Sequence, residues 1–247
     1  MNEENLIYGT RAVIEAVREG KEIEKIFIQR GLNNPLMSEL KKQLKDSDVF
    51  FNDVPAEKLN RLTQKNHQGV VAFLSSIVYY KIEELLPAIF ERGEVPLIIL
   101  LDRVTDVRNM GAVARTAECA GAQAIITPTR GGALINSDAI KASAGALHRV
   151  PVCREDNLKL TLEYLSASGL QIIACTEKTE QLIYAADLKV PCVIIMGSEE
   201  NGISGEYLKR ADSLVKIPLH GKISSLNVSV ATAVILYEAL RQRMSVR

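Results

Sequence analysis

The sequence predicts an α/β protein in which a small N-terminal α/β/α unit precedes a larger domain built on a parallel sheet. From residue 96 onward, short apolar runs alternate with helical patterns, and runs such as Leu97–Leu101 show no polar alternation. Strands that are buried on both faces of a parallel sheet have this composition. Residues 77–95 contain a proline and a glycine and interrupt the pattern. We therefore expect domains over residues 1–76 and 96–247, joined by a linker over residues 77–95.

The N-terminal unit is expected to alternate helices with short strands. Its helical patterns begin at residues that favour a helix start, such as Thr10 after a glycine, and Pro35. The expected helices are Thr10–Arg18, Pro35–Leu44 and Pro55–Leu62, and the expected strands are Lys25–Gln29, 48–51 and Val70–Leu74. The linker is expected to hold one short helix without a strand partner, packed on the second domain.

The larger domain is expected to alternate strands and helices in the order of a parallel sheet. Its expected strands are Leu97–Leu101, Ala124–Thr127, Val150–Cys153, Leu170–Ala174, Val193–Met196 and Ser213–Ile217. Its expected helices are Asn109–Gly121, Asp138–Leu147, Leu158–Leu165 and Val228–Leu240. Asn109 is expected at the start of the first of these helices, where its side chain would accept from free backbone N–H groups.

Composition excludes several classes of protein. The formal net charge is zero, the hydrophobic content is 47%, and no apolar run approaches the roughly 20 residues that cross a bilayer. The start of the chain lacks a signal-peptide pattern, so we expect a cytoplasmic protein. The four cysteines and three histidines are dispersed, which favours reduced thiols and gives no expectation of a metal site.

The charge of residues 1–76 is balanced, with eleven Lys and Arg against eleven Asp and Glu. Bulk charge therefore does not indicate a nucleic-acid-binding unit. A basic face could still form locally, although ordinary solvated charge explains the same scatter. The candidates for such a face are Arg11, Arg18, Lys41, Lys42, Arg61 and Lys65.

Three polar, partly glycine-rich loops follow the carboxyl ends of predicted strands, and this edge is where open α/β sheets bind ligands. Glycine lets the backbone approach a ligand closely. None of the loops has the spacing of a phosphate-binding P-loop or of a dinucleotide-binding GxGxxG motif. The residues alone therefore predict a small-molecule site near Asn109, Arg115, Glu199, Ser225 and Asn227.

The same loops resemble the three signature motifs of the SpoU family of RNA ribose 2′-O-methyltransferases, within the SPOUT superfamily. They read DRVTDVRNMGAVARTAECAGA from Asp102, IIMGSEENGIS from Ile194, and KIPLHGKISSLNVSVATAVILYEALRQR from Lys216. The N-terminal stretches YGTRAVIEAV and NHQGVVA resemble the substrate-binding domain of the branch that methylates a guanosine of large-subunit ribosomal RNA. The motifs occur in the family's order and spacing, so the resemblance covers most of the chain.

The resemblance implies a fold, a cofactor and a partner. The fold is a parallel sheet whose C-terminal segment forms a deep trefoil knot, which no residue pattern here predicts. The cofactor is S-adenosylmethionine, held by the loops around residues 174–177, 196–202 and 217–227. The family's homodimer forms its active sites across the interface, and the apolar helix Val228–Leu240, including Ala231 and Ile235, is expected to be buried there.

The resemblance also assigns roles to residues. Asn109, Arg115, Glu199, Ser225 and Asn227 match the catalytic positions. The cofactor is expected to contact Thr176, Met196, Gly197, Gly202, Ile217, Leu219 and Leu226. One position departs from the family pattern, because Glu200 stands where the second motif usually has glycine. We expect cofactor binding to survive this change.

The expected function is S-adenosylmethionine-dependent 2′-O-methylation of a ribose in large-subunit ribosomal RNA, with guanosine as the expected nucleotide. Transfer RNA is an alternative substrate. A non-catalytic RNA-binding or ribosome-assembly protein is a second alternative, disfavoured because Asn109, Arg115 and the loop glycines are all present.

Overall fold

The structure is a computed structural model that describes residues 5–47, 49 and 51–244. It divides into two compact units, one of Met1–Val78 with Ile135–Ser137 and one of Tyr79–Leu134 with Asp138–Arg247. Each unit contains its own sheet. The predicted α/β class is confirmed.

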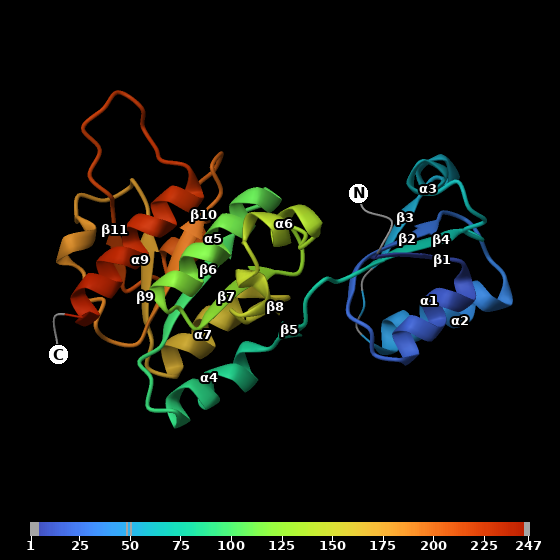
Figure 1. Cartoon of the computed structure of the whole chain (residues 1–247), viewed down its shortest axis with the longest axis horizontal. Helices are drawn as coiled ribbons and strands as arrows, with labels where there is room; N and C mark the ends of the chain where they lie inside the picture. The colour runs from blue at the N-terminus through green and yellow to red at the C-terminus, as the bar shows by residue number, and fades with distance from the viewer. Residues whose placement is uncertain (1–4, 48, 50, 245–247) are drawn as a thin grey trace. The chain divides into compact units, whose positions relative to one another are not determined.

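The N-terminal unit is a four-stranded sheet in the order β1-β4-β2-β3, with helices on both faces (Figure 1). Its strands are β1 (Leu6–Tyr8), β2 (Ile23–Gln29), β3 (Phe51–Val54) and β4 (Val70–Leu74). Its helices are α1 (Thr10–Arg18), α2 (Pro35–Asp46) and α3 (Ala56–Leu62). Only β2 and β3 are parallel, while β4 is antiparallel to both of its neighbours.

Alternation along β2 gives this unit two cores, because successive side chains of a strand point to opposite faces. Ile26 and Ile28 pack with α1 and α2, whereas Phe27 packs with Leu59 of α3. The strand predicted at 48–51 lies three residues later, at β3. Residues 48 and 50 lie outside the described residues.

The second unit is built on a seven-stranded, fully parallel sheet in the order β11-β9-β10-β6-β7-β8-β5. Its strands are β5 (Tyr79–Tyr80), β6 (Leu97–Asp102), β7 (Ala124–Pro128), β8 (Val152–Glu155), β9 (Gln171–Cys175), β10 (Cys192–Gly197) and β11 (Ser213–Val215). Every residue of β6 is buried. This central strand is therefore apolar throughout because helices cover both faces of the sheet, as the sequence predicted.

Two layers of helices flank this sheet (Figure 1). The helices are α4 (Ile82–Glu91), α5 (Val107–Ala120), α6 (Ser137–Ala142), α7 (Leu158–Ala167), α8 (Gly205–Leu208) and α9 (Val228–Met244), with short 3₁₀ turns at η2 (Ala146–His148) and η3 (Ile183–Ala185). Helices α4 and α7 share a core with alternate residues of β6, including Ile98 and Leu100. Helices α5 and α9 pack against each other and contact β7 and β10 respectively.

The segment 77–95 was predicted to lack a strand partner, and this is wrong for Tyr79 and Tyr80. They form β5 and pair with β8 at the edge of the larger sheet. The buried carboxylate of Glu155 then accepts from the backbone N–H of Ile82 at 3.0 Å, at the start of α4. This segment therefore supplies part of the second unit's structure.

Several other predicted boundaries differ, among them that of β8, predicted at Val150–Cys153 and found at Val152–Glu155. Helix α5 begins at Val107, because Asp106 is its N-cap, so the prediction that Asn109 caps this helix is wrong. The helix predicted over 138–147 is broken by Ala144 and Gly145, which both have positive φ. Strand β11 ends at Val215, two residues early.

On the side that faces its own chain, α9 buries Ile235, Leu236 and Ala239 fully, together with the polar Thr232 and Glu238. Ile235 therefore belongs to the chain's own core, and its prediction as an interface residue is wrong. The exposed side chains of α9 that are apolar include Val230, Tyr237 and Met244, spaced seven residues apart. They form one stripe along the helix.

The described part of the chain contains no helix that is long and apolar enough to cross a membrane. Within it, no group of three or more His, Cys, Asp and Glu side chains could hold a metal ion. All four cysteines are free thiols. The trefoil knot stays a prediction.

Gly111 of α5 gives a test of how closely α5 packs on α6. A Cβ atom at Gly111 would lie 2.5 Å from the carbonyl oxygen of Ala139 and 2.6 Å from the Cβ of Ala142. We expect Gly111→Ala to lower the free energy of unfolding by about 1–3 kcal/mol, because overpacking outweighs alanine's helix-propensity gain of about 1 kcal/mol.

The matched control is Gly205→Ala at the start of α8, where an added Cβ meets nothing within 4 Å. This variant should be as stable as wild type or slightly more stable in urea denaturation. Equal midpoints for the two variants would contradict the close packing of α5 on α6.

Candidate active site

A pocket of about 560 Å³ lies at the carboxyl ends of β9, β10 and β11. The loops after these strands form it, as expected for ligand sites of open α/β sheets. Its volume is in the range of small-molecule sites, about 300–1,000 Å³. All seven predicted cofactor residues line it: Thr176, Met196, Gly197, Gly202, Ile217, Leu219 and Leu226.

Backbone hydrogen bonds join the first and third of these loops. The N–H of Thr176 donates to the carbonyl oxygen of Val215 at 2.8 Å, and the N–H of Lys216 donates to that of Gln181 at 2.8 Å. The N–H of Ile183 donates to the carbonyl oxygen of Lys216 at 3.0 Å. The two loops therefore continue the parallel ladder of β9 and β11 past the sheet and form one wall of the pocket.

Glycine makes the tight turn after β10 possible. The N–H of Gly202 donates to the carbonyl oxygen of Ser198 at 2.9 Å, and Gly202 has a φ of +62°. A Cβ atom on Gly197 would lie 2.2 Å from the carbonyl carbon of Gly202. Any side chain at Gly197 would therefore displace the turn, and with it the wall of the pocket. Glu200 at the tip of the turn does not take a positive φ, so its side chain is tolerated.

An ion pair at the end of β6 fastens the far side of this turn. The buried carboxylate of Asp102 accepts from the N–H of Ser204 at 2.7 Å. It also accepts two hydrogen bonds from the guanidinium of Arg103, at 3.0 and 3.1 Å. Arg103 in turn donates to the carbonyl oxygen of Gly202 at 3.2 Å. Arg103 does so from a left-handed backbone conformation, with φ +56°.

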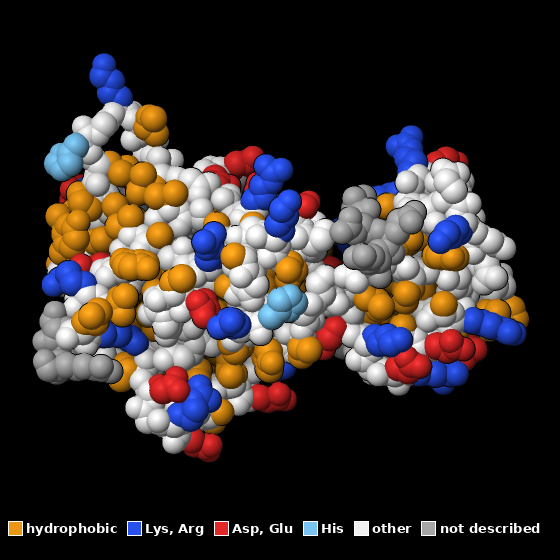
Figure 2. All heavy atoms as spheres, viewed as in Figure 1, with side chains coloured by type: hydrophobic (Ala, Val, Ile, Leu, Met, Phe, Trp, Pro, Cys, Tyr) orange, Lys and Arg blue, Asp and Glu red, His pale blue; other side chains and the backbone are white. Residues whose placement is uncertain are grey.

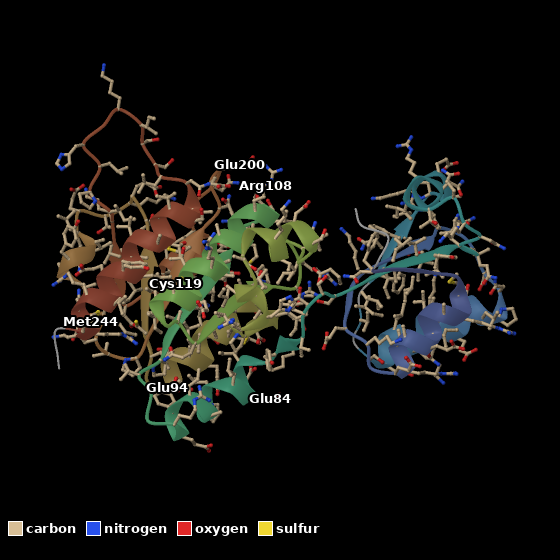
Figure 3. All side chains as sticks on the ribbon, viewed as in Figure 1. Glu84, Glu94, Arg108, Cys119, Glu200 and Met244 are labelled. Atoms are coloured by element: carbon tan, nitrogen blue, oxygen red, sulfur yellow. The ribbon has the colours of Figure 1, made fainter. Side chains whose placement is uncertain are left out.

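Asn109, Glu199 and Asn227 form a polar network beside the pocket. The carboxylate of Glu199 accepts from the side-chain amides of Asn109, at 2.5 Å, and of Asn227, at 2.9 Å. The Asn227 amide also donates to the side-chain oxygen of Asn109 at 3.1 Å. Each residue comes from a different predicted motif. The labelled side chains of Arg108 and Glu200 mark this end of the sheet in Figure 3.

Asn227 also fixes the start of α9. Its side-chain oxygen accepts from the backbone N–H of Ser229 at 3.0 Å and from the hydroxyl of Ser229 at 2.6 Å. This is the arrangement of a helix N-cap. The amide of the same side chain remains directed at Glu199, so Asn227 serves both the helix and the network.

The remaining two catalytic candidates lie apart from the network. Ser225 is exposed and lines the pocket. Arg115 is exposed on α5, six residues after Asn109, which places it about 9 Å farther along the helix axis. Among the described residues, none accepts a hydrogen bond from the Arg115 guanidinium. Arg115 is therefore available to an external anion.

Sequence reasoning missed several residues of the site. Ala231 lines the pocket, as do Glu177 and Lys178, and its place at a dimer interface stays a prediction. The roles of Asp102 and Arg103 were missed as well. Asp102 could have been suspected as a carboxylate directly at the end of a buried strand, but nothing in the sequence marks Arg103.

The pocket also contains a neutral thiol. Burial, together with the nearby carboxylate of Glu177, raises the pKa of Cys175 to about 12. Cys175 therefore stays protonated at neutral pH and contributes an uncharged surface to the pocket.

Glycines shape this pocket at the carboxyl ends of a parallel sheet, and a network of two amides and a carboxylate lies beside it. Such a site suits an enzyme that uses a small organic cofactor. The SpoU rRNA Methylase family matches residues 96–237, and the RNA 2′-O ribose methyltransferase substrate binding family matches residues 6–80. The protein belongs to the SpoU rRNA methylase family.

Individual relatives agree with this assignment. An uncharacterized tRNA/rRNA methyltransferase of Synechocystis sp. is 37% identical over 97% of this chain, which spans 63% of that relative's length. The 23S rRNA (guanosine-2′-O-)-methyltransferase RlmB of Pseudomonas aeruginosa is 36% identical, with 98% of each chain covered. The solved SpoU methyltransferase AviRb from Streptomyces viridochromogenes, in complex with the cofactor AdoMet, has a TM-score of 0.62 at 25% identity over 97% of this chain and 90% of that chain.

The protein is an RNA 2′-O-methyltransferase, and its cofactor is S-adenosylmethionine. The pocket fits this cofactor chemically. Met196, Ile217 and Leu226 offer apolar surface to a purine ring, and the glycine turn exposes backbone groups for polar contacts. The carboxylates of Glu177 and Glu199 suit a cofactor that carries a positively charged sulfonium.

Two variants of Arg103 separate its guanidinium from its backbone conformation. We expect both Arg103→Ala and Arg103→Gly to weaken S-adenosylmethionine binding about five- to tenfold, because each loses the hydrogen bond to Gly202. Arg103→Gly should be the more stable of the two by about 1 kcal/mol, since only glycine adopts a positive φ without strain.

Isothermal calorimetry gives the affinities, and urea denaturation gives the stabilities. If Arg103→Gly binds the cofactor as wild type does while Arg103→Ala binds it weakly, cofactor affinity depends on the backbone conformation at residue 103. It then does not depend on the hydrogen bond from Arg103 to Gly202.

Proposed function

We propose that the protein methylates the ribose 2′-hydroxyl of a guanosine in large-subunit ribosomal RNA. The observation that carries this proposal is the match to the Pseudomonas aeruginosa enzyme over 98% of both chains, N-terminal unit included. In this proposal the N-terminal unit binds RNA and the C-terminal unit performs methyl transfer. The match of residues 6–80 to a substrate-binding family supports this division.

Transfer RNA is the second candidate substrate. The Synechocystis relative carries both substrates in its name, as does the Bacillus subtilis relative YacO, and these names favour this alternative. Methylation of unmodified total RNA with labelled cofactor, followed by mapping of the modified nucleotide, distinguishes the two. Label on a guanosine of large-subunit RNA supports the proposal, and label confined to transfer RNA overturns it.

In the proposed chemistry, Arg115 acts on the RNA. When bound, S-adenosylmethionine supplies a methyl group that its sulfonium has already activated, so the protein needs alignment and charge stabilisation. A guanidinium has a pKa above about 12 and is a poor general base. Arg115 therefore clamps the target phosphate through two hydrogen bonds and stabilises negative charge that develops on the 2′-oxygen.

Asn109, Glu199 and Asn227 position the reacting groups. The two amides hold Glu199 from different elements, α5 and the start of α9, so the carboxylate has a fixed orientation. Preorganised groups of this kind lower the cost of aligning substrates. Ser225, exposed at the rim of the pocket, contacts the ribose in this proposal.

Arg115→Ala tests the role of the guanidinium. We expect methyl transfer to fall at least a thousandfold, while S-adenosylmethionine affinity stays within several-fold of wild type, since Arg115 does not line the pocket. Single-turnover methylation and calorimetry measure the two quantities. The conservative variant Arg115→Lys should keep the charge but lose bidentate binding, and remain strongly impaired. Substantial turnover by Arg115→Ala would exclude the proposed role.

The proposal includes a homodimer whose active sites combine residues of both chains. Arg115 lies apart from the network of its own chain, which supports a function toward the partner's site. Subunit mixing tests this idea: combining inactive Arg115→Ala chains with inactive Glu199→Ala chains should restore part of the activity, because mixed dimers contain one intact site. Mixtures that stay inactive under conditions of subunit exchange would argue for sites within single chains.

The proposed dimer face includes the exposed stripe of α9. Obligate interfaces are apolar and typically bury about 2,000 Å² or more in total. Tyr237 is 52% exposed in the single chain, so Tyr237→Glu should leave the monomer folded but block association, as a buried unpaired charge is costly. Sedimentation velocity should then report a folded, inactive monomer. Helix α5 packs against α9. If α5 belongs to the same face, Thr116→Glu on α5 should also give a folded monomer. A wild-type chain that is monomeric and active at micromolar concentration would end the dimer proposal.

A further inference from the structure

The N-terminal unit carries a group of cations on the side of its sheet that α3 covers. The sheet face beneath α3 contains Tyr8, Phe27 and Phe73, which pack with Leu59 and Leu62 of α3. Four cations lie around this core, from β2, from α3 and from the loop after α3. We call them the α3-side cations: Lys25, Lys58, Arg61 and Lys65.

Aromatic rings hold three of these cations in place. The ammonium groups of Lys25 and Lys58 lie 5.2 and 4.9 Å from the ring centroid of Phe27, on which they converge. Lys65 lies 5.5 Å from the ring centroid of Tyr8. A cation–π contact attracts an ammonium group without cancelling its charge. These contacts therefore order the lysines and leave their positive charge facing the solvent.

On the opposite side of the unit, some of the cations form ion pairs with carboxylates. There Arg18 pairs with Glu39 at 2.6 Å and Lys41 with Asp53 at 3.7 Å. Both were candidates for a basic face, and these ion pairs offset their charges, although Lys41 also lies 5.6 Å from the ring centroid of Phe51. Of the four α3-side cations, none forms an ion pair within the described residues. In Figure 2 the acidic side chains of this unit gather mainly on the side of α1 and α2.

We propose that the α3-side cations bind the sugar–phosphate backbone of the substrate RNA; this inference rests on the proposed function. Ordered, unpaired cations suit phosphates, which bind in proportion to the number of charges that they meet. Phe27 is only 7% exposed, so the ring beneath Lys25 and Lys58 does not stack on bases. The surface therefore supplies affinity and positioning, and leaves the choice of nucleotide to other contacts.

The test removes three charges from this side and, in a matched control, three from the other side. The test variant is Lys25→Gln/Lys58→Gln/Lys65→Gln, and the control is Lys21→Gln/Lys42→Gln/Lys45→Gln in exposed positions on or next to α1 and α2. The full-length protein is titrated with an in vitro transcript of large-subunit ribosomal RNA at several salt concentrations. S-adenosylmethionine binding, measured by calorimetry, should be the same for both variants and wild type.

We expect the test variant to bind the transcript at least tenfold more weakly near physiological salt. Its slope of log affinity against log salt should be smaller by about 2–3, since three phosphate contacts are lost. The control should stay within about threefold of wild type. Equal losses in both variants would mean that only overall charge matters, and would overturn the proposal. Unchanged affinity of the test variant would also overturn it.

The proposed substrate is judged separately by methylation at saturating RNA. If wild type methylates ribosomal RNA and the test variant binds it normally, the surface is wrong and the function stands. If wild type methylates only transfer RNA, and the test variant but not the control loses affinity for it, the surface stands and the ribosomal substrate is wrong.

Discussion

The register of β10 between β6 and β9 is the constraint on which the active site depends. In this register Gly197 stands opposite Asp102 across the parallel ladder. The turn that begins at Gly197 can therefore reach back to the end of β6, where Asp102 accepts from Ser204 and Arg103 donates to Gly202. Because side chains alternate along a strand, a slip of one residue would turn Asp102 away from this turn. Sheet pairing thus sets the shape of the pocket before any cofactor contact is made.

The backbone of the site is tightly packed, whereas some of its polar side chains are exposed. Gly197 and Gly202 approach so closely that the turn has little freedom, whereas Glu199 is exposed and depends on two amides for its orientation. A carboxylate held in this way keeps its access to solvent and avoids the desolvation cost of a buried charge. The buried charge of the region is instead Asp102, which is satisfied by Arg103 and Ser204. The structure separates the charge that holds the turn, Asp102, from a charge that lines the pocket, Glu199.

Much of this arrangement could be predicted, because glycine-rich loops at strand ends carry strong local signals. The seven residues expected at the cofactor pocket all line it. Other features could not be predicted for definable reasons. Asp106 and Asn109 are both good helix caps three residues apart, and only the backbone decides between them. Arg103 occupies a left-handed conformation for which glycine is the usual signal.

Helix α9 shows a further limit of sequence reasoning. A count of apolar residues indicates that more than one side of a helix is covered, but does not tell which partner covers each side. Ile235 is covered by the chain itself, while Tyr237, two positions later, is half exposed. The structure of the single chain therefore shows which residues of α9 belong to the core and which are exposed to a partner. The composition of the helix does not show this.

The effect of charged residues, like that of apolar ones, depends on which of them the chain itself leaves without a partner. The chain has a formal net charge of zero, and its N-terminal unit is balanced, yet electrostatic attraction to RNA depends on which charges remain unpaired at one surface. Ion pairs such as Arg18 with Glu39 remove cations from that set, whereas cation–π contacts such as Lys58 with Phe27 retain them. Two faces with similar numbers of lysines can therefore attract a polyanion to different extents. A neutral protein can therefore present unpaired cations on one face while ion pairs offset cations such as Arg18 and Lys41 on another.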